Sequence, residues 1–293
     1  MAQELSQIVL PLALALMMLV MGLSVTVDHF RRVLQQPALI VTGLLLQWLL
    51  LPLLAMVLVR VLALPAELAL GVFILAACPG GATSNVISHL SGGDAALSVS
   101  LTALVSVLSP LTLPLSLAVM MDSASISVFS VELSYRSVVL PLLLVTALPL
   151  MLGMLVAHRW PRWTMRHALT ANRFSFGLFL MLVMALGWSN AERLPQLGSL
   201  LTVACLGLCL LVMMCSALIG HAVFRQWPVT RTLAIEAGIQ NAGTAMMISA
   251  TLLNRPDLAL VALFYGILMN LPAIVLIGYH QFATAGYTEA REY

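Results

Sequence analysis

The chain has 293 residues, of which 61% are apolar and 8% are charged. A soluble domain carries about 25% charged residues, so this chain has too little polar surface to coat a water-soluble globule. The composition excludes disordered, collagen-like and ordinary cytosolic proteins, and it predicts an all-α membrane protein with several spans in the lipid bilayer. All 13 basic residues are arginine, and a formal net charge of +2 gives no indication of nucleic-acid binding.

Nine segments are apolar over the roughly 20 residues that a transmembrane helix needs. In chain order they run 7–27, 38–60, 66–90, 94–120, 135–157, 172–190, 197–223, 229–253 and 257–280. Residues 1–4 contain no basic residue, so we expect the first segment to be a retained span and not a cleaved signal peptide. The longest polar connections are expected at 121–134 and 158–171, and no stretch is left for a soluble domain.

The arginines predict the orientation of the chain in the membrane. With nine spans the two ends lie on opposite faces, and one face collects nine arginines against four on the other. Because cytoplasmic loops carry the excess of basic residues, the bias predicts an N-terminus outside and a cytoplasmic C-terminus. The nine are Arg31, Arg32, Arg159, Arg162, Arg166, Arg173, Arg225, Arg231 and Arg291, and the four are Arg60, Arg136, Arg193 and Arg255.

A weak internal repeat relates two parts of the chain. Residues 80–97 align with 243–260 at six identical positions, where chance in so Leu- and Ala-rich a chain would give about two. The third predicted span runs inward and the eighth outward, so the two copies are inverted relative to each other. Inverted repeats are typical of secondary transporters. A symmetric design would have ten helices, so nine spans indicate that the first repeat lacks its first helix.

Both copies contain a polar, glycine-bearing interruption inside a span, at 78–85 and at 236–244. Proline removes a backbone donor and glycine weakens a helix, so both spans are predicted to break near the middle of the membrane. Freed carbonyls at such breaks can bind cations, and a new helix N-terminus can bind an anion. A simple pair of kinks is the alternative, but kinks do not require the accompanying Glu, Gln, Asn and Ser.

Glu236 is the one acidic residue that lies well inside a predicted span. The other ten acids fall in tails, loops and span ends, where Asp94 and Asp257 are predicted to cap helices. An intramembrane carboxylate indicates a functional site. A structural ion pair with Arg231 is the alternative, but that arginine is five residues away and on another helix face. A bound cation is therefore the predicted partner, with a protonated Glu236 as the competing state.

Neutral oxygen-bearing side chains accompany Glu236. Gln240 follows four residues later on the same helix face, Ser98 and Thr102 share a face of the fourth span, and Gln47 lies alone in an apolar run. One carboxylate among neutral oxygens suits a hard cation such as Na⁺, whereas zinc and copper prefer thiolate and imidazole ligands. The four cysteines lie in apolar runs without a CxxC pair, and the six histidines fall near span ends without metal-ligand spacing.

Taken together, these motifs resemble the bile acid:sodium symporter family over essentially the whole chain. The resemblance rests on the runs 21–23, 28–32, 78–81, 84–85, 94–98 and 236–241. It implies a bacterial inner-membrane protein with a panel domain, a core domain and two broken helices that cross in the core. The panel helices are expected at about 7–60 and 135–190, and the core helices at about 66–120 and 197–280.

The family resemblance also implies two Na⁺ sites. The residues that match the first site are Ser84, Asn85, Ser98, Thr102 and Glu236. The residues that match the second are Gln47, Glu236, Gln240 and the backbone carbonyls of Ala237 and Ile239. Two Na⁺, one ionised Glu and a monovalent organic anion sum to zero charge, which matters because a net buried charge is costly.

We expect the co-transported organic anion at the crossing, near Asn241, with Thr83 and Asn270 as neighbours. Related bacterial members can read Thr-Ala where this chain has Ala82-Thr83, which shifts one candidate hydroxyl by a residue. Small carboxylates such as pantoate or other oxo- and hydroxy-acids are as compatible with the sequence as steroid-like bile acids. The expected activity is sodium-coupled symport by alternating access.

Other functions stay open at this stage. A proton-coupled carrier or a metalloid exporter would use Glu236 as a titrating group. An intramembrane enzyme is disfavoured, because the chain has no pair of intramembrane aspartates, no HExxH and no evident Ser–His dyad. A non-transporting sensor is disfavoured by the inverted repeat.

Overall fold

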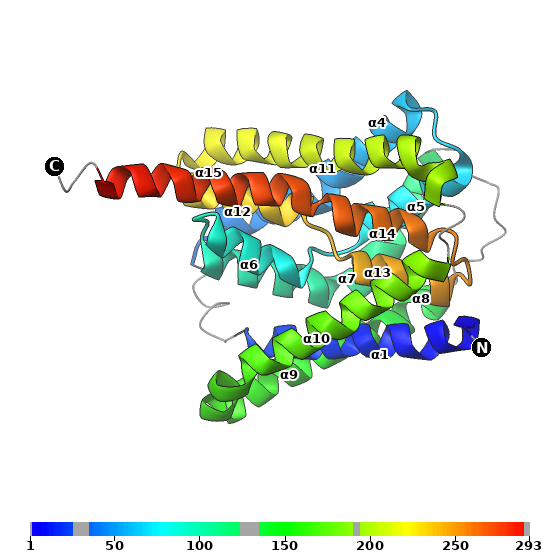
Figure 1. The fold of residues 1–293 in the computed structure, drawn as a ribbon, viewed down its shortest axis with the longest axis horizontal. Coiled ribbons are helices and arrows are strands. Elements are labelled where there is room, and N and C mark those ends of the chain that lie inside the picture. The colour runs from blue at the N-terminus through cyan, green and yellow to red at the C-terminus, as the bar shows by residue number, and fades with distance from the viewer. Residues whose placement is uncertain (1, 26–34, 124–134, 190–193, 290–293) are drawn as a thin grey trace.

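The computed structural model describes residues 2–25, 35–123, 135–189 and 194–289, and these are almost entirely helical (Figure 1). In these ranges, five helices are long and apolar enough to cross a membrane: Pro37–Val61, Ala95–Ser123, Val138–Arg159, Leu200–Phe224 and Ala259–Phe282. Shorter apolar helices cover Ile8–Leu23, Ala66–Ala77 and Ala242–Leu252. The predicted class, an all-helical protein with several spans, is confirmed, and the count of nine spans stays a prediction.

The helices follow one another with short connections. The first half of the chain contains α1 (Ala2–Leu23), α3 (Pro37–Leu45), α4 (Leu51–Val61), α5 (Ala66–Ala77), α6 (Ala82–Leu90), α7 (Ala95–Ser123), α8 (Tyr135–Leu142) and α9 (Leu148–Arg159). The second contains α10 (Pro161–Ser189), α11 (Leu194–Phe224), α12 (Trp227–Gly238), α13 (Ala242–Met247), α14 (Ala259–Leu268) and α15 (Asn270–Glu289). π-helical turns η1 (Leu46–Leu50), η2 (Leu143–Ala147) and η3 (Ile248–Leu252) join α3 to α4, join α8 to α9 and extend α13.

Two of the π turns precede a proline. Pro52 follows η1 and Pro149 follows η2, each at the second position of the next α-helix. A proline in a helix clashes with the carbonyl four residues earlier and cannot donate to it. A wider turn at that point rearranges the freed carbonyls without ending the helix. The turn η1 matters for function because it contains Gln47.

The polar connection expected at 158–171 is mostly helical. α9 continues to Arg159 and α10 begins at Pro161, so nearly the whole stretch is helical. Proline is well suited to the first position of a helix. Trp163 and His167 then stack one turn apart, with ring centroids 4.8 Å from each other. The arginines at 159–173 therefore lie within helices and do not mark a long break in the helical structure.

The two helices that were predicted to break do so, at 78–81 and 239–241. α5 and α12 are buried almost all round, as expected of helices in the centre of a bundle. The breaks cross as an isolated antiparallel bridge between Gly80 and Gln240. The Gly81 N–H donates to Ile239 O at 3.0 Å, and the Asn241 N–H donates to Pro79 O at 2.9 Å. Each break therefore satisfies backbone groups that the other frees.

In the structure, equivalent helices of the two repeat copies are not separated by the 163 residues that the sequence alignment used. α6 and α13 begin at Ala82 and Ala242, which are 160 positions apart, whereas α7 and α14 begin at Ala95 and Ala259, 164 apart. The second copy accommodates its extra residues in η3 and in the connection 253–258. The alignment Gly80/Gly243 is therefore wrong at the break itself, where Gly80 lies opposite Gln240.

The packing separates two groups of helices. Figure 1 shows α1, α9 and α10 together on the opposite side from α11, α12 and α15, and the same three helices pack against one another. At Gly22 and Gly153 the backbones of α1 and α9 are so close that a Cβ on either glycine would overlap a carbonyl oxygen. The segment Pro37–Val61, expected in the panel, packs instead on α5, α7, α11 and α12. This contact pattern groups it with the core helices, while the division into two domains stays a prediction.

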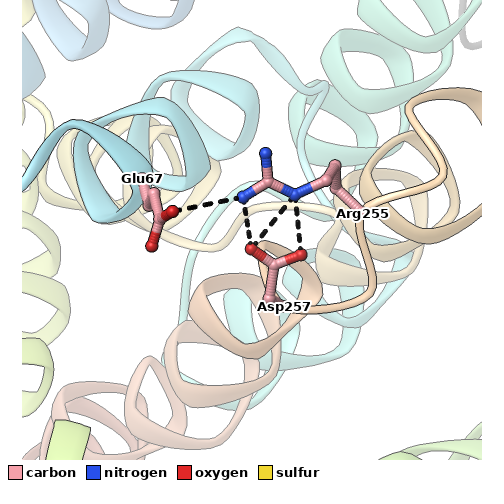
Figure 2. Close-up of polar contacts among 3 residues, drawn as sticks. All are labelled: Glu67, Arg255 and Asp257. Atoms are coloured by element: carbon pink, nitrogen blue, oxygen red, sulfur yellow. Dashed lines mark hydrogen bonds and ion pairs between the residues drawn. The ribbon is translucent and has the colours of Figure 1, made fainter. Parts of the chain in front are cut away.

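A salt bridge links the start of the first broken helix to the end of the second (Figure 2). Arg255 donates to Asp257 at 2.6 and 2.9 Å and lies 3.5 Å from Glu67 in the first turn of α5. The hydrogen bond to Asp257 raises the pKa of Arg255. The prediction that Asp257 caps the ninth span is wrong, because Leu258 is the N-cap of α14 and the Asp257 carboxylate binds Arg255 in a bidentate pair. Asp94 does cap α7, accepting from the N–H groups of Ala96 and Leu97 at 3.0 Å.

Candidate functional site

Glu236 lies on α12, two residues before that helix ends, and is 1% exposed. Its carboxylate accepts hydrogen bonds from three hydroxyls on α6 and α7. The donors are Ser84 Oγ at 2.6 Å, Ser98 Oγ at 2.5 Å and Thr102 Oγ1 at 2.6 Å. The structure therefore brings Glu236 together with three of its predicted partners. Gly80 permits this approach, because a Cβ there would lie 3.3 Å from Glu236 Oε2.

The oxygen atoms around Glu236 form more close oxygen–oxygen contacts than the available hydroxyl hydrogens can satisfy. Asn85 Oδ1 lies 2.9 Å from Ser98 Oγ and 3.2 Å from Thr102 Oγ1, and Ser84 Oγ lies 2.7 Å from the Gly81 carbonyl oxygen. Each hydroxyl carries one hydrogen, so three hydroxyls cannot donate to all of these acceptors at once. Oxygens that face one another without enough hydrogens are a suitable environment for a hard cation.

No described basic side chain balances the charge of Glu236. Arg231, the one alternative ion-pair partner, directs its Nη1 to Ser91 O at 3.1 Å and to His280 Nδ1 at 3.0 Å. Among the described residues, Arg255 forms ion pairs with Asp257 and Glu67, but it lies in the connection after η3 and not on α12. An ionised carboxylate buried among neutral hydroxyls requires a cation to be stable.

Two amide side chains near Glu236 leave polar atoms without hydrogen bonds. Gln47 is buried in η1, which packs on α12, and among the described residues neither Nε2 nor Oε1 has a partner. Gln240 directs its Nε2 to the Ala237 carbonyl at 2.7 Å, and its buried Oε1 has no partner in the described part of the chain. Buried amides normally form hydrogen bonds, so these atoms are available to contact a ligand.

The two backbone carbonyls of the second predicted set are both engaged. The Ala237 carbonyl accepts from Gln240 and the Ile239 carbonyl accepts from Gly81. A carbonyl oxygen has two lone pairs, so each can still contact an ion. The residues of this set thus fit a cation, although the structure records no direct contact from Gln47 to Glu236.

The three candidate substrate residues line one cavity of about 300 Å³. Thr83 and Asn241 border it from the crossing, and Asn270 borders it from the start of α15. Asn241 also caps α13 by accepting from the Thr244 N–H at 3.0 Å, while its buried Nδ2 has no partner among the described residues. Asn270 donates from Nδ2 to the Gly266 carbonyl at 2.7 Å. The cavity is also bordered by α1 and α10 through Met17 and Leu180.

The sequence reasoning missed Tyr265, which is fully buried on α14. Its hydroxyl donates to the Gly238 carbonyl at 2.8 Å, and the Cys209 thiol reaches the same oxygen at 3.6 Å. These contacts fix the last carbonyl of α12 directly before the break. A tyrosine inside an apolar run was the available signal, since a buried phenol needs a hydrogen-bond partner.

The model of the Sodium Bile acid symporter family matches residues 11–197 of the chain. The chain belongs to this family. The matched range contains the first broken helix and ends before the second. The family model therefore covers the residues on α6 and α7 but not Glu236.

Individual relatives of this symporter family extend the similarity across most of the chain. The chain is 30% identical over 273 residues to the uncharacterized sodium-dependent transporter YocS of Bacillus subtilis, which covers 91% of this chain and 81% of that protein. The human ileal sodium/bile acid cotransporter is 28% identical over 287 residues, covering 93% and 78%. The human P3 protein is 33% identical over 243 residues, and the chain spans about half its length, with 49% covered.

These findings establish the general activity. The helices that can span a membrane and the symporter family make the chain a multi-pass transport protein of the plasma membrane, within a sodium-dependent family. Family members are transporters, which is consistent with the expectation that the chain is not an enzyme.

Proposed function

We propose that this protein couples the import of a small organic anion to Na⁺ by alternating access. The observation that carries the proposal is the buried Glu236 carboxylate of α12 in a hydrogen-poor shell of oxygens from α6 and α7. The crossing of two broken helices supports it, since secondary transporters bind ions and substrates where helices break. We place the protein in a bacterial inner membrane, with the N-terminus outside as the arginine bias predicts.

Two Na⁺ ions are proposed to bind on the two sides of the Glu236 carboxylate. The first would be held by Glu236 together with Ser84, Asn85, Ser98 and Thr102. The second would be held by Glu236, Gln47, Gln240 and the carbonyls of Ala237 and Ile239. The unpartnered oxygens of Gln47 and Gln240 support the second site, because a Na⁺ ion would supply the contact that the described residues do not.

The cavity supports a small carboxylate as the co-transported anion. Its volume of about 300 Å³ is at the lower end of the range of ligand pockets, about 300–1,000 Å³, which suits pantoate or another oxo- or hydroxy-acid better than a steroid. Its polar lining comes from uncharged amide and hydroxyl side chains, which can orient a carboxylate by hydrogen bonds. The positive charge that the anion needs would come from the two Na⁺ ions behind the crossing.

The decisive experiment is uptake into proteoliposomes by the purified Glu236→Gln variant. We expect uptake driven by a Na⁺ gradient to fall by about a hundredfold or more, because both ions lose their charged ligand inside the membrane. Glu67→Gln is the matched control, since that glutamate is exposed at the far end of the core. Wild-type uptake by Glu236→Gln with unchanged Na⁺ dependence would refute the proposal.

The same assay separates the competing coupling modes. Replacing Na⁺ by choline at fixed pH abolishes uptake if Na⁺ is the coupling ion. Undiminished uptake in choline, driven instead by a pH gradient, would assign Glu236 to a proton-coupled carrier.

A further inference from the structure

Three helices continue the polar character of the Glu236 cluster toward one end of the core. On each helix the polar residues recur at three or four positions, so they share one face. The rows are Ser84, Ser88 and Ser91 on α6 and its end, Thr102, Ser98 and Asp94 on and before α7, and Glu236 and Thr232 on α12. The row on α6 includes Ser91 Oγ, which is buried without a hydrogen-bond partner among the described residues.

A second polar layer lies one helical turn from the Glu236 cluster. Ser88 Oγ and Thr232 Oγ1 are 2.9 Å apart, and both side chains are fully buried. The Asp94 N–H donates to Thr232 Oγ1 at 2.8 Å, and the Asp94 carbonyl oxygen lies 3.3 Å from the same hydroxyl. The oxygens in contact with Thr232 Oγ1 are thus a hydroxyl and a backbone carbonyl, while the Asp94 carboxylate is engaged in capping α7.

The connection from Ser91 to Asp94 covers the end of the row of polar residues that leads away from Glu236. The Gly93 N–H donates to Ser88 O at 2.8 Å, and a Cβ on Gly93 would lie 2.5 Å from Ser88 Oγ and 2.6 Å from Thr232 Oγ1. Gly92 has a φ of +70°, a conformation that glycine adopts without strain. Arg231 donates to Ser91 O at 3.1 Å, which places a positive charge at the closed end.

We propose that Ser88 and Thr232 form a transit site through which Na⁺ leaves the Glu236 cluster toward the face of the core that carries Arg231. This inference rests on the proposed Na⁺ coupling. A dehydrated ion needs oxygen ligands at each step and ligands weak enough to release it. The hydroxyls of the second layer meet both needs, since they follow a carboxylate site without offering another charge. The Ser91–Asp94 connection, with Arg231 repelling cations behind it, closes the route until it moves.

The test compares Na⁺ binding with Na⁺ release in Ser88→Ala and Thr232→Val. Half-saturating Na⁺ in thermal unfolding of the purified chain is expected to change by less than about twofold, because the Glu236 ligands are intact. Exchange of radioactive Na⁺ across proteoliposomes is expected to slow about tenfold in either variant, since an apolar side chain replaces an oxygen on the path. Thr230→Val is the matched control, since Thr230 is buried on the same helix and its Cα lies 3.5 Å from where a Cβ on Gly220 of α11 would be.

The outcomes distinguish this inference from the proposed function. A wild-type chain that Na⁺ does not stabilise would refute both. Stabilisation by Na⁺ together with wild-type exchange in Ser88→Ala and Thr232→Val would refute the transit site alone. Equal slowing in Thr230→Val would also refute it, because the effect would then come from packing. Two independent variants keep the test valid if one of them does not fold.

Discussion

At the scale of single residues, one group near Glu236 carries the charge and other groups supply the neutral oxygens. The carboxylate is the charged group, while Ser84, Ser98 and Thr102 supply neutral oxygens at hydrogen-bond distance. Removing one neutral ligand should therefore weaken cation binding without leaving a buried charge unpaired. This distinguishes the ligands from Glu236, whose loss removes the charge itself.

We expect Gln240→Ala to raise the Na⁺ concentration for half-maximal uptake by about three- to tenfold. This corresponds to the loss of one polar contact, which contributes about 0.5–1.5 kcal/mol. The maximal rate should change less, because Gln240 also borders the substrate cavity but the three residues proposed to bind the substrate, Thr83, Asn241 and Asn270, are retained. Gln226→Ala is the matched control, an exposed glutamine next to the start of the same helix. An unaltered Na⁺ curve in Gln240→Ala would remove this residue from the ligand set.

At the scale of elements, each broken helix depends on the other. The bridge at Gly80 and Gln240 holds the two breaks together and places α6 and α12 around the same cluster. Glycine at position 81 is part of this arrangement, because a Cβ there would lie 3.0 Å from the Gln240 carbonyl oxygen. That oxygen belongs to the crossing backbone and cannot move without disturbing the bridge.

Gly81→Ala is expected to destabilise the folded protein by about 1–3 kcal/mol, the usual cost of overpacking a close contact. The thermal unfolding midpoint should fall, and Na⁺ should stabilise the variant less than the wild type. Gly177→Ala on α10 is the control, because a Cβ there would meet no atom within 4 Å. Equal midpoints for the two variants would contradict the role assigned to the crossing.

Hydropathy and spacing predicted the helical class and the two breaks, and they selected the polar residues that meet at Glu236. Hydropathy and spacing did not predict features that depend on the backbone conformation. The Arg-rich start of α10 looked like a loop because charge marks the membrane boundary and carries no information on where a helix begins. Identity in the repeat aligned Gly80 with Gly243, and the π turn η3 and the longer connection after it were not visible in the sequence. Asp257 was predicted to cap a helix because the pairing with Arg255 depends on loop conformation.

At the scale of the whole molecule, the cavity joins two groups of helices. Met17 on α1 and Leu180 on α10 border it on one side, and Asn241 and Gly266 border it on the other. A substrate bound there would contact both groups, whereas the hydrogen-bonded cluster of Glu236 is built from α6, α7 and α12 and from none of α1, α9 and α10. Ordering the breaks with Na⁺ would favour substrate binding, and by linkage the substrate must favour Na⁺ equally.

This reciprocity predicts the outcome of thermal unfolding with candidate carboxylates. A true substrate at about 100 times its dissociation constant should stabilise the chain by about 2.7 kcal/mol in Na⁺, and by much less in choline. Raising the substrate concentration should in turn lower the Na⁺ concentration needed for half-maximal stabilisation. Equal shifts in Na⁺ and choline would show that the two ligands bind without coupling.

Four of the arginines used to predict the orientation lie outside the described residues: Arg31, Arg32, Arg193 and Arg291. The direction in which the protein crosses the membrane therefore stays a prediction from the sequence.

The antiparallel bridge between the breaks has a consequence for biosynthesis. The Pro79 carbonyl and the Gly81 N–H find their partners on residues 239 and 241, which the ribosome adds about 160 residues later. Until the second break arrives, the first is inserted with backbone groups that lipid cannot satisfy. The first half of the chain can therefore reach its final shape only after nearly the whole protein has been translated, and chains truncated before residue 239 should be substrates for membrane quality control.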